Sequence, residues 1–326
     1  MAKEGETVIV RVERETKLRL PLLNLEGIVC VGNAISVSPY LMAACARKGV
    51  GISFMNEYGR FLARVVGPVS GNILLRKEQY RRSDDEKASA EIACSIVIGK
   101  TANAKTTLSR YLRDHDPRDS DVRTAVERLK ANVAMLREKR SLDGIRGVEG
   151  ESAKTYFSVF DKLIVAQKKT FFFSERSRRP PMDNVNALLS YGYTLLRHDV
   201  ESALECVGLD PQAGFLHRDR PGRPSLALDI MEEFRHPFVD RMVLSLINRK
   251  EVTGKNFKQT ASGAVMMDDD ARKTILKNYH DRKKNEIFHE FIKEKMPIGS
   301  LFLAQAMLMA RHIRGDLDAY PPLIWR

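Results

Sequence analysis

Cysteine is scarce in this sequence, and the scarcity excludes two kinds of stabilising site. Four cysteines occur in 326 residues, and no two of them form a CxxC pair. Widely spaced thiols argue against a disulfide framework and against structural zinc, and they fit a reducing, intracellular setting. The cysteines are Cys30, Cys45, Cys94 and Cys206.

Long apolar runs and common nucleotide-binding motifs are also missing. No apolar run reaches the roughly 18 residues that a membrane span requires, and residues 1–17 lack the apolar segment of a signal peptide. We therefore expect a cytoplasmic protein with no contact to a membrane. Neither GxxxxGK[ST] nor GxGxxG occurs, so ATP and dinucleotide sites have no support, and no GxSxG or Cys–His signature indicates a hydrolase nucleophile.

Positive charge is in excess. The chain has 54 Lys and Arg against 42 Asp and Glu, a formal net charge of +12. Nucleic acid is the commonest polyanionic partner of such a protein, although many basic proteins bind none. The length suggests two domains, or one large one, with enough material for a core.

The patterning predicts an α+β protein, with a small N-terminal β domain over 1–72 and a larger all-helical domain over 73–326. Short alternating or apolar segments fill most of the first domain, and a short helix between Ser38 and Gly49 interrupts them. The second domain has helical spacing almost throughout. Its predicted helices cover 85–112, 119–140, 150–169, 184–206, 224–249, 268–294 and 297–314.

Two basic loops stand out in the second domain. Residues 171–186 combine aromatic and arginine side chains with the consecutive prolines Pro180 and Pro181, which prevent a continuous helix. Residues 217–225 begin with His217 and end with Pro224 and Ser225, which suit the start of a helix.

The helix that follows carries an unusual acidic stripe. At 100° per residue, five polar side chains fall within about 100° of arc, while apolar residues cover the rest. They are Asp229, Glu232, Glu233, His236 and Asp240. An ordinary solvated stripe is one interpretation. The other is a metal site, since clustered carboxylates repel one another without a cation, and carboxylates with the nearby His217 suit Mg²⁺ or Mn²⁺.

Two further possibilities stay open from the residues alone. His236 lies four residues after Glu232, a spacing that zinc could use, although Pro237 disturbs the backbone there. Glu149 lies between glycines at the expected start of the helix over 150–169, where an exposed backbone can approach another element. An acidic residue there, Glu149 or its neighbour Glu151, often only compensates the helix dipole.

Four segments together strongly resemble the CRISPR-associated adaptation integrases, the "Cas-one" family, with features similar to subtype I-C. The segments are GIRGVEG, NALLSYGYTLLRHDVESALECVGLDPQAGFLH, RPSLALDIMEEFR and ARHIRGDLDAYPPLIWR. The resemblance implies a metal-dependent DNA endonuclease and integrase that inserts short foreign DNA fragments into the CRISPR array by attack of a 3′-hydroxyl on a phosphodiester. It also implies a homodimer that bridges to a dimer of the "Cas-two" partner, with double-stranded DNA fragments and CRISPR-repeat DNA as substrates.

The resemblance also selects residues. Its GxEG, GFxH and following-helix motifs match Glu149, His217 and Glu232 as catalytic ligands of Mg²⁺ or Mn²⁺. Asp229 matches a further acidic position, as an outer or alternative ligand, whereas Glu233 and His236 match no ligand.

The basic loops are expected to position the DNA. We expect Arg178, Arg179 and Arg223 to contact phosphates and Phe173 to pack on a base or sugar. Family members usually begin with one or two more strands ahead of GETVIVRVERE, so we expect dimer geometry and partner docking to be affected here. The competing hypotheses are a basic DNA-binding scaffold that needs no metal, and a helical di-metal oxidoreductase, for which the paired ExxH helices are lacking.

Overall fold

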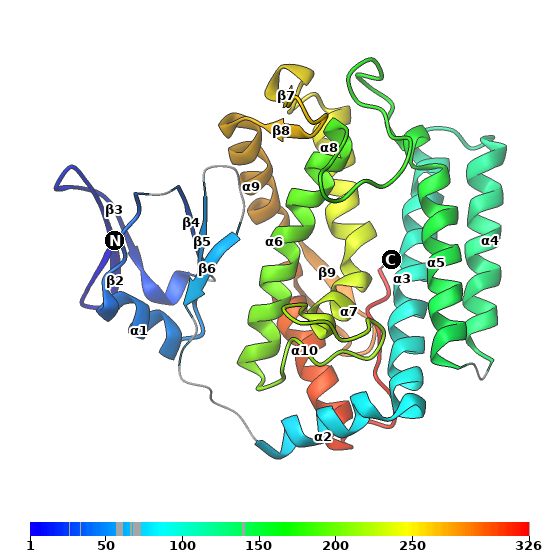
Figure 1. Ribbon diagram of the computed structural model, residues 1–326, viewed down its shortest axis with the longest axis horizontal. Coiled ribbons are helices and arrows are strands. Elements are labelled where there is room, and N and C mark those ends of the chain that lie inside the picture. Colours follow the sequence, from blue (N-terminus) through cyan, green and yellow to red (C-terminus); the bar gives the residue numbers. More distant parts are fainter. Residues whose placement is uncertain are drawn as a thin grey trace. The chain divides into compact units, whose positions relative to one another are not determined.

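The computed structural model describes residues 1–325, except for residues 26, 33, 57–60, 66, 68–72 and 139–140 and the side chains of Met55 and Phe61. The chain divides into two compact units, 1–71 and 72–326. Figure 1 shows strands in the first unit and mostly helices in the second, so the predicted α+β class is confirmed. Among the described helices, none is long and apolar enough to cross a bilayer.

The N-terminal unit contains two three-stranded sheets around one core. β1 (Ala2–Glu4), β2 (Thr7–Val12) and β3 (Glu15–Pro21) form an antiparallel sheet in that order, and a single 3₁₀ turn, η1 (Leu22–Asn24), follows. β4 (Gly27–Val31) pairs in parallel with β5 (Gly51–Met55), which pairs antiparallel with β6 (Phe61–Val65). Both sheets and the helix described next contribute side chains to the core, which contains Val8, Leu22, Cys30, Leu41, Ala44, Cys45, Val50 and Ile52.

The short helix predicted between Ser38 and Gly49 is confirmed as α1 (Pro39–Arg47). The Ser38 side chain accepts a hydrogen bond from the Leu41 amide, which caps the N-terminus. Gly49 has a φ of +70°, the left-handed conformation that ends a helix and favours glycine. This helix supplies the crossover that lets β4 and β5 run parallel.

The second unit is built around one long helix. α3 (Glu86–Asp114) packs against α4 (Ser120–Leu136), α5 (Leu142–Ser158) and α7 (Ser225–Phe234). The remaining helices are α2 (Ile73–Asp84), α6 (Asn184–Cys206), α8 (Arg241–Asn248), α9 (Asp269–Lys283) and α10 (Ile298–Arg314), with the short turns η2 (Phe160–Leu163) and η4 (Gly254–Asn256). The prediction that this unit is all-helical is wrong in detail, because it also contains two strand pairs. β7 (Phe257–Gln259) pairs with β8 (Val265–Met267), and β9 (Glu286–His289) pairs with β10 (Glu294–Pro297).

Three helix predictions are corrected. The helix expected over 150–169 is α5, which begins eight residues earlier at Leu142, where the Ser141 side chain accepts from the Gly144 amide. The helix expected over 268–294 ends at Lys283. The helix expected over 224–249 is broken by η3, a π-helical turn over Arg235–Asp240, because Pro237 has no amide hydrogen to continue the α-helical pattern.

The C-terminal tail is docked. Tyr320, Leu323 and Trp325 are buried. Asn103 of α3 clamps the tail: its side-chain amide donates to the Leu323 carbonyl at 2.9 Å, and its oxygen accepts from the Trp325 amide at 2.7 Å. Figure 1 shows the tail running along α3.

Candidate metal centre

The segment before His217 is held against the start of α7 by a buried glutamine and a glycine. Gln79 of α2 accepts from the Asp210 amide and donates to the carbonyls of Asp210 and Ala213, each at 2.8–2.9 Å. A Cβ on Gly214 would lie 2.7 Å from the Ser225 backbone and 2.9 Å from Asp229 Oδ2. Only glycine therefore allows this approach without a shift, and the segment delivers His217 to the side of α7.

Asp229 organises the imidazole of His217. Its Oδ2 accepts from the amides of Phe215 and Leu216 at 2.6 and 3.0 Å, and its Oδ1 accepts from the His217 amide at 3.0 Å. The same Oδ1 lies 2.6 Å from His217 Nδ1. A proton on Nδ1 serves this contact and leaves the Nε2 lone pair facing Glu232, whose Oε1 is 3.9 Å away. Asp229 thus positions the predicted ligand His217, and both of its oxygens are already engaged.

The acidic stripe of α7 and η3 is buried, so the solvated-stripe interpretation is wrong. All five of its residues are at most 2% exposed. They lie between α7 and the helices that surround it, where a carboxylate must be paired or neutralised. They are Asp229, Glu232, Glu233, His236 and Asp240.

Glu232 lies at the bottom of the candidate site and is surrounded by cations. Burial alone raises its pKa, but the Arg235 guanidinium, the Lys100 ammonium and His217 together hold the pKa of Glu232 well below its usual range. Arg235 reaches Oε1 at 3.1 Å, and Lys100 Nζ lies 2.7 Å from Oε2. Lys100 is thus the charged partner of Oε2, and Arg235 is that of Oε1.

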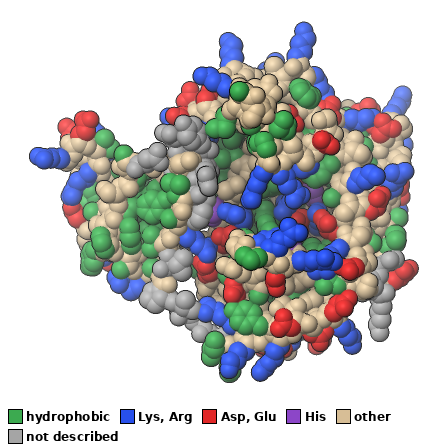
Figure 2. All heavy atoms as spheres, in the orientation of Figure 1, with side chains coloured by type: hydrophobic (Ala, Val, Ile, Leu, Met, Phe, Trp, Pro, Cys, Tyr) green, Lys and Arg blue, Asp and Glu red, His purple; other side chains and the backbone are tan. Residues whose placement is uncertain are grey.

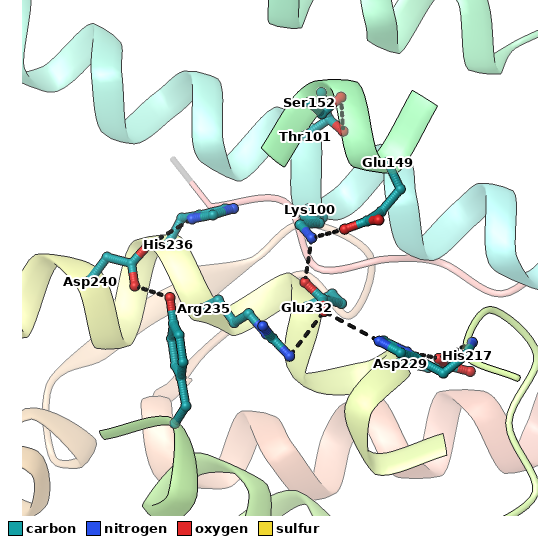
Figure 3. Close-up of polar contacts among 11 residues, drawn as sticks. Lys100, Thr101, Glu149, Ser152, His217, Asp229, Glu232, Arg235, His236 and Asp240 are labelled. Atoms are coloured by element: carbon teal, nitrogen blue, oxygen red, sulfur yellow. Dashed lines mark hydrogen bonds and ion pairs between the residues drawn. The ribbon is translucent and has the colours of Figure 1, made fainter. Parts of the chain in front are cut away.

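Glu149 completes the cluster from a third element. It lies in the middle of α5, not at a helix start as predicted. Its charge therefore does not compensate the positive end of the helix dipole. Lys100 of α3 hydrogen-bonds to Glu149 while it ion-pairs with Glu232, so the ammonium lies between the two carboxylates (Figure 3). One turn before Glu149, Arg146 donates to the Leu216 carbonyl at 2.8 Å, which ties α5 to the segment of His217.

The three predicted ligands therefore share one site, open on one side. The side chains of Glu149 and His217 are 28% and 20% exposed, whereas that of Glu232 is 3% exposed. Two carboxylates and an imidazole nitrogen form a donor set suited to Mg²⁺ or Mn²⁺, and Lys100 is paired with both carboxylates. Within the described part of the chain, no three such side chains are close enough to hold an ion as they stand, since Lys100 intervenes here.

A second buried cluster fixes the other cation, Arg235. Its guanidinium lies over the Tyr193 ring at 5.0 Å. The Tyr193 hydroxyl donates to Asp240 Oδ1, and His236 Nδ1 lies 2.8 Å from Asp240 Oδ2 (Figure 3). The conceivable zinc pairing of His236 with Glu232 is not formed, because His236 is bonded to Asp240 instead.

Glu233 belongs to the C-terminal tail and not to the site. Its Oε2 accepts from the Leu323 amide and from Gln305, each at 2.8 Å. Burial raises the pKa of Glu233 to about 8, even though these hydrogen bonds from Leu323, Tyr320 and Gln305 lower it. Glu233 therefore carries a proton at neutral pH for much of the time and anchors the tail.

Arginine side chains gather near the open side. Burial lowers the pKa of Arg223, and the neighbouring Arg220, Arg178 and Arg235 lower it further, while Asp229 opposes them. Figure 2 shows Lys and Arg side chains collected on this face of the helical unit, with histidine visible between them. Arg178 and Arg179 are exposed on the loop before α6.

The expected nucleic-acid contact of Phe173 is wrong. Its side chain is 5% exposed and stacks on Phe157 with ring centroids 5.5 Å apart. It also meets Phe160 edge-on at 5.0 Å. Phe173 is thus part of the helical core, and the exposed aromatic residue of this segment is Phe172.

Three residues that shape the site are not predicted from the sequence. Lys100, Arg235 and Gln79 each contact the proposed ligands or the segment that carries His217. The one available signal was Arg235, three residues after Glu232 on a helix otherwise rich in apolar residues, where a lone cation needs a buried acidic partner. The sequence around Lys100 and Gln79 contains no signal that predicts a role in the site.

Comparison with known proteins identifies the family. A family model described as CRISPR associated protein Cas1 matches residues 1–281. A CRISPR-associated endonuclease Cas1 of Chlorobaculum tepidum is 54% identical over 329 residues, covering all of this chain and 95% of that protein. A second, from Rhodospirillum rubrum, is 47% identical over 332 residues with the same coverage.

Solved structures share the fold. A Cas1 protein from Thermotoga maritima superposes with a TM-score of 0.78 at 25% identity, covering 96% of this chain and 93% of that one. A casposase bound to an integration product superposes with a TM-score of 0.81 at 23% identity, covering 99% and 91%. Because the family model spans most of the chain and full-length relatives exceed 40% identity, the chain belongs to the CRISPR-associated Cas1 family.

Proposed function

We propose that this protein is a divalent-metal-dependent DNA endonuclease and integrase of CRISPR adaptation. In this proposal it inserts short foreign DNA fragments into the CRISPR array by attack of a 3′-hydroxyl on a phosphodiester. The names of its Cas1 relatives, which are endonucleases, support the nuclease part. The casposase of similar fold, bound to an integration product, supports the strand-transfer part.

One observation carries the proposal. Glu149, His217 and Glu232 come from α5, from the segment before α7 and from α7 itself, and they meet in one partly open site. Each has a supporting partner: Lys100 for Glu149, Asp229 for His217, Arg235 for Glu232. A chain that used its basic surface only as a scaffold would have no reason to bury the carboxylates of Asp229 and Glu232 beside an imidazole.

The ligands would be Glu149 and Glu232 through oxygen and His217 through Nε2. Bound there, Mg²⁺ or Mn²⁺ would supply Lewis-acid stabilisation of charge on the reacting phosphate and lower the pKa of the attacking hydroxyl. The protein's own contribution is position. Asp229 orients the imidazole, and Arg235 holds the buried Glu232 in its charged form.

DNA would lie across the open side of this site. Arg178, Arg179 and Arg223 are our proposed phosphate contacts, since the first two are exposed and Arg223 lies in a group of arginines beside Asp229. A phosphate there would relieve the mutual repulsion of the guanidinium groups. The expected substrates are double-stranded DNA fragments and CRISPR-repeat DNA.

The assembly is part of the proposal. We propose a cytoplasmic homodimer that docks on a dimer of Cas2, with features of subtype I-C. Two structures of similar fold are a Cas6-RT-Cas1–Cas2 complex and a partial form of it, which supports such a partner.

A strand-transfer assay tests the proposal. Labelled short duplexes are mixed with plasmid carrying a CRISPR repeat, Mn²⁺ or Mg²⁺, and variants Glu149→Gln, His217→Asn and Glu232→Gln. Each should lower transfer to below about one hundredth of wild type. Glu151→Gln is the matched control, since Glu151 is exposed on the same helix, two residues from Glu149.

The non-catalytic scaffold is the competing function. It predicts DNA binding that is indifferent to Mn²⁺, Mg²⁺ and chelator, and no transfer by the wild-type protein. Near-wild-type transfer by any of the three variants would equally contradict the proposed ligand set.

A further inference from the structure

Lys100 occupies the space that a bridging cation would need. It is 5% exposed on α3, hydrogen-bonds to Glu149 Oε1 and places Nζ 2.7 Å from Glu232 Oε2 (Figure 3). An ammonium and a divalent ion would compete there for the same carboxylate oxygens, and their like charges would repel at such short range. The two occupants therefore exclude each other from this position.

The charges of the site are already nearly balanced without any ion. Glu149, Asp229 and Glu232 contribute three negative charges, and Lys100 and Arg235 contribute two positive ones. A divalent ion adds two positive charges, which leaves an excess of one unless Lys100 withdraws.

The two cations differ in freedom to move. Arg235 is fixed, with its guanidinium over the Tyr193 ring and its contact on Glu232 Oε1. Lys100 has a flexible four-carbon stem, and its single ammonium is shared between Glu149 and Glu232.

We infer that Lys100 is a positioning residue that holds Glu149 and Glu232 together in the metal-free protein and must leave the space between them when the metal binds. Lys100 thereby weakens metal binding while it offsets the repulsion between the two carboxylates. The inference rests on the proposed function, since it deepens the account of the same site.

Calorimetric titration of Mn²⁺ into DNA-free protein tests it, with wild type, Lys100→Met and the control Lys87→Met. Lys87 is exposed on the same helix, so its loss controls for removing one positive charge. Lys100→Met should bind Mn²⁺ at least about tenfold more tightly than wild type, and Lys87→Met should match wild type. Without metal, Lys100→Met should unfold at a lower temperature than wild type, and Mn²⁺ should reverse that order.

Equal or weaker binding by Lys100→Met would overturn the inference, because a merely structural lysine would cost stability without raising affinity. If Lys100→Met does not fold, Lys100→Gln gives the same comparison with a neutral donor in place. If wild type shows metal-dependent strand transfer and Lys100→Met has an unchanged affinity for Mn²⁺, this inference is wrong while the proposed function stands. If neither wild type nor Lys100→Met binds Mn²⁺, both this inference and the proposed function are wrong.

Discussion

Asp229 Oδ1 lies 2.6 Å from His217 Nδ1, and its other oxygen accepts from the amides of Phe215 and Leu216. One carboxylate therefore fixes both the backbone that carries the imidazole and the ring itself. This explains why a buried acidic side chain next to the three proposed ligands need not be one of them.

Replacing Asp229 with asparagine should weaken the site without abolishing it. An amide nitrogen would face the donors that Asp229 now accepts from, so the free energy of unfolding should fall by about 1–3 kcal/mol. Metal affinity or transfer should fall by about 10- to 100-fold, less than for the ligand variants. Mn²⁺ titration and denaturant unfolding measure both. The control is Asp219→Asn, since Asp219 is an exposed carboxylate on the loop between His217 and α7. Wild-type affinity in Asp229→Asn would show that His217 needs no such support.

Gly214 should not tolerate a side chain. The added Cβ of Gly214→Ala would meet the Ser225 backbone at 2.7 Å, so the segment must shift, with a loss of about 1–3 kcal/mol in stability. The control is Gly147→Ala in α5, where a Cβ meets nothing within 4 Å and should add about 0.5–1 kcal/mol by helix propensity. Denaturant unfolding of both variants measures the contrast, and similar effects from the two would contradict the close packing.

Glu233 should make stability fall as pH rises. In the folded protein this carboxyl keeps its proton up to about pH 8, whereas in the unfolded chain it releases it near 4.5. Its contribution is therefore complete below pH 4.5 and is lost between there and pH 8, at no more than about 1.4 kcal/mol per pH unit. Unfolding free energies between pH 5 and 9 should show a flatter profile in Glu233→Gln than in wild type. Parallel profiles would mean that the folded carboxyl is already charged.

The loop arginines should set the salt dependence of DNA binding. Alanine at Arg178 or Arg223 should each reduce the slope of log affinity against log salt concentration by about 0.9 for one lost phosphate contact. Arg128 is exposed on α4 and serves as the control for a lost surface charge. Fluorescence anisotropy on a short duplex at several salt concentrations gives the slopes. A slope that does not change removes the arginine from the DNA footprint.

The elements with clear local signals were predictable from the sequence. Alternation located β2 and β3, and Ser38 with Gly49 located α1, because caps and periodicity act over a few residues. The hairpins β7–β8 and β9–β10 were not predicted, since strands of three or four residues are too short to show a periodic pattern. The start of α5 was predicted too late because its glycines weaken the helical pattern. The spacing of Leu142, Ile145 and Val148, which form its buried face, does indicate a helix there.

The site was predictable only in part. Local spacing identified the stripe from Asp229 to Asp240 but could not say that it was buried, because burial depends on the helices packed around it. Joining Glu149 to His217, 68 residues later, required the family resemblance. Lys100 lies in a helix where a lysine is ordinarily solvated, and only the three-dimensional packing of α3 against α5 and α7 brings it between the two carboxylates.

Anomalous X-ray diffraction from crystals grown with Mn²⁺ tests directly whether these three side chains bind a metal. We predict one strong peak within about 2.0–2.6 Å of a carboxylate oxygen of Glu149, a carboxylate oxygen of Glu232 and Nε2 of His217. The absence of any peak there at saturating Mn²⁺, or a peak whose ligands include none of these three side chains, would contradict it.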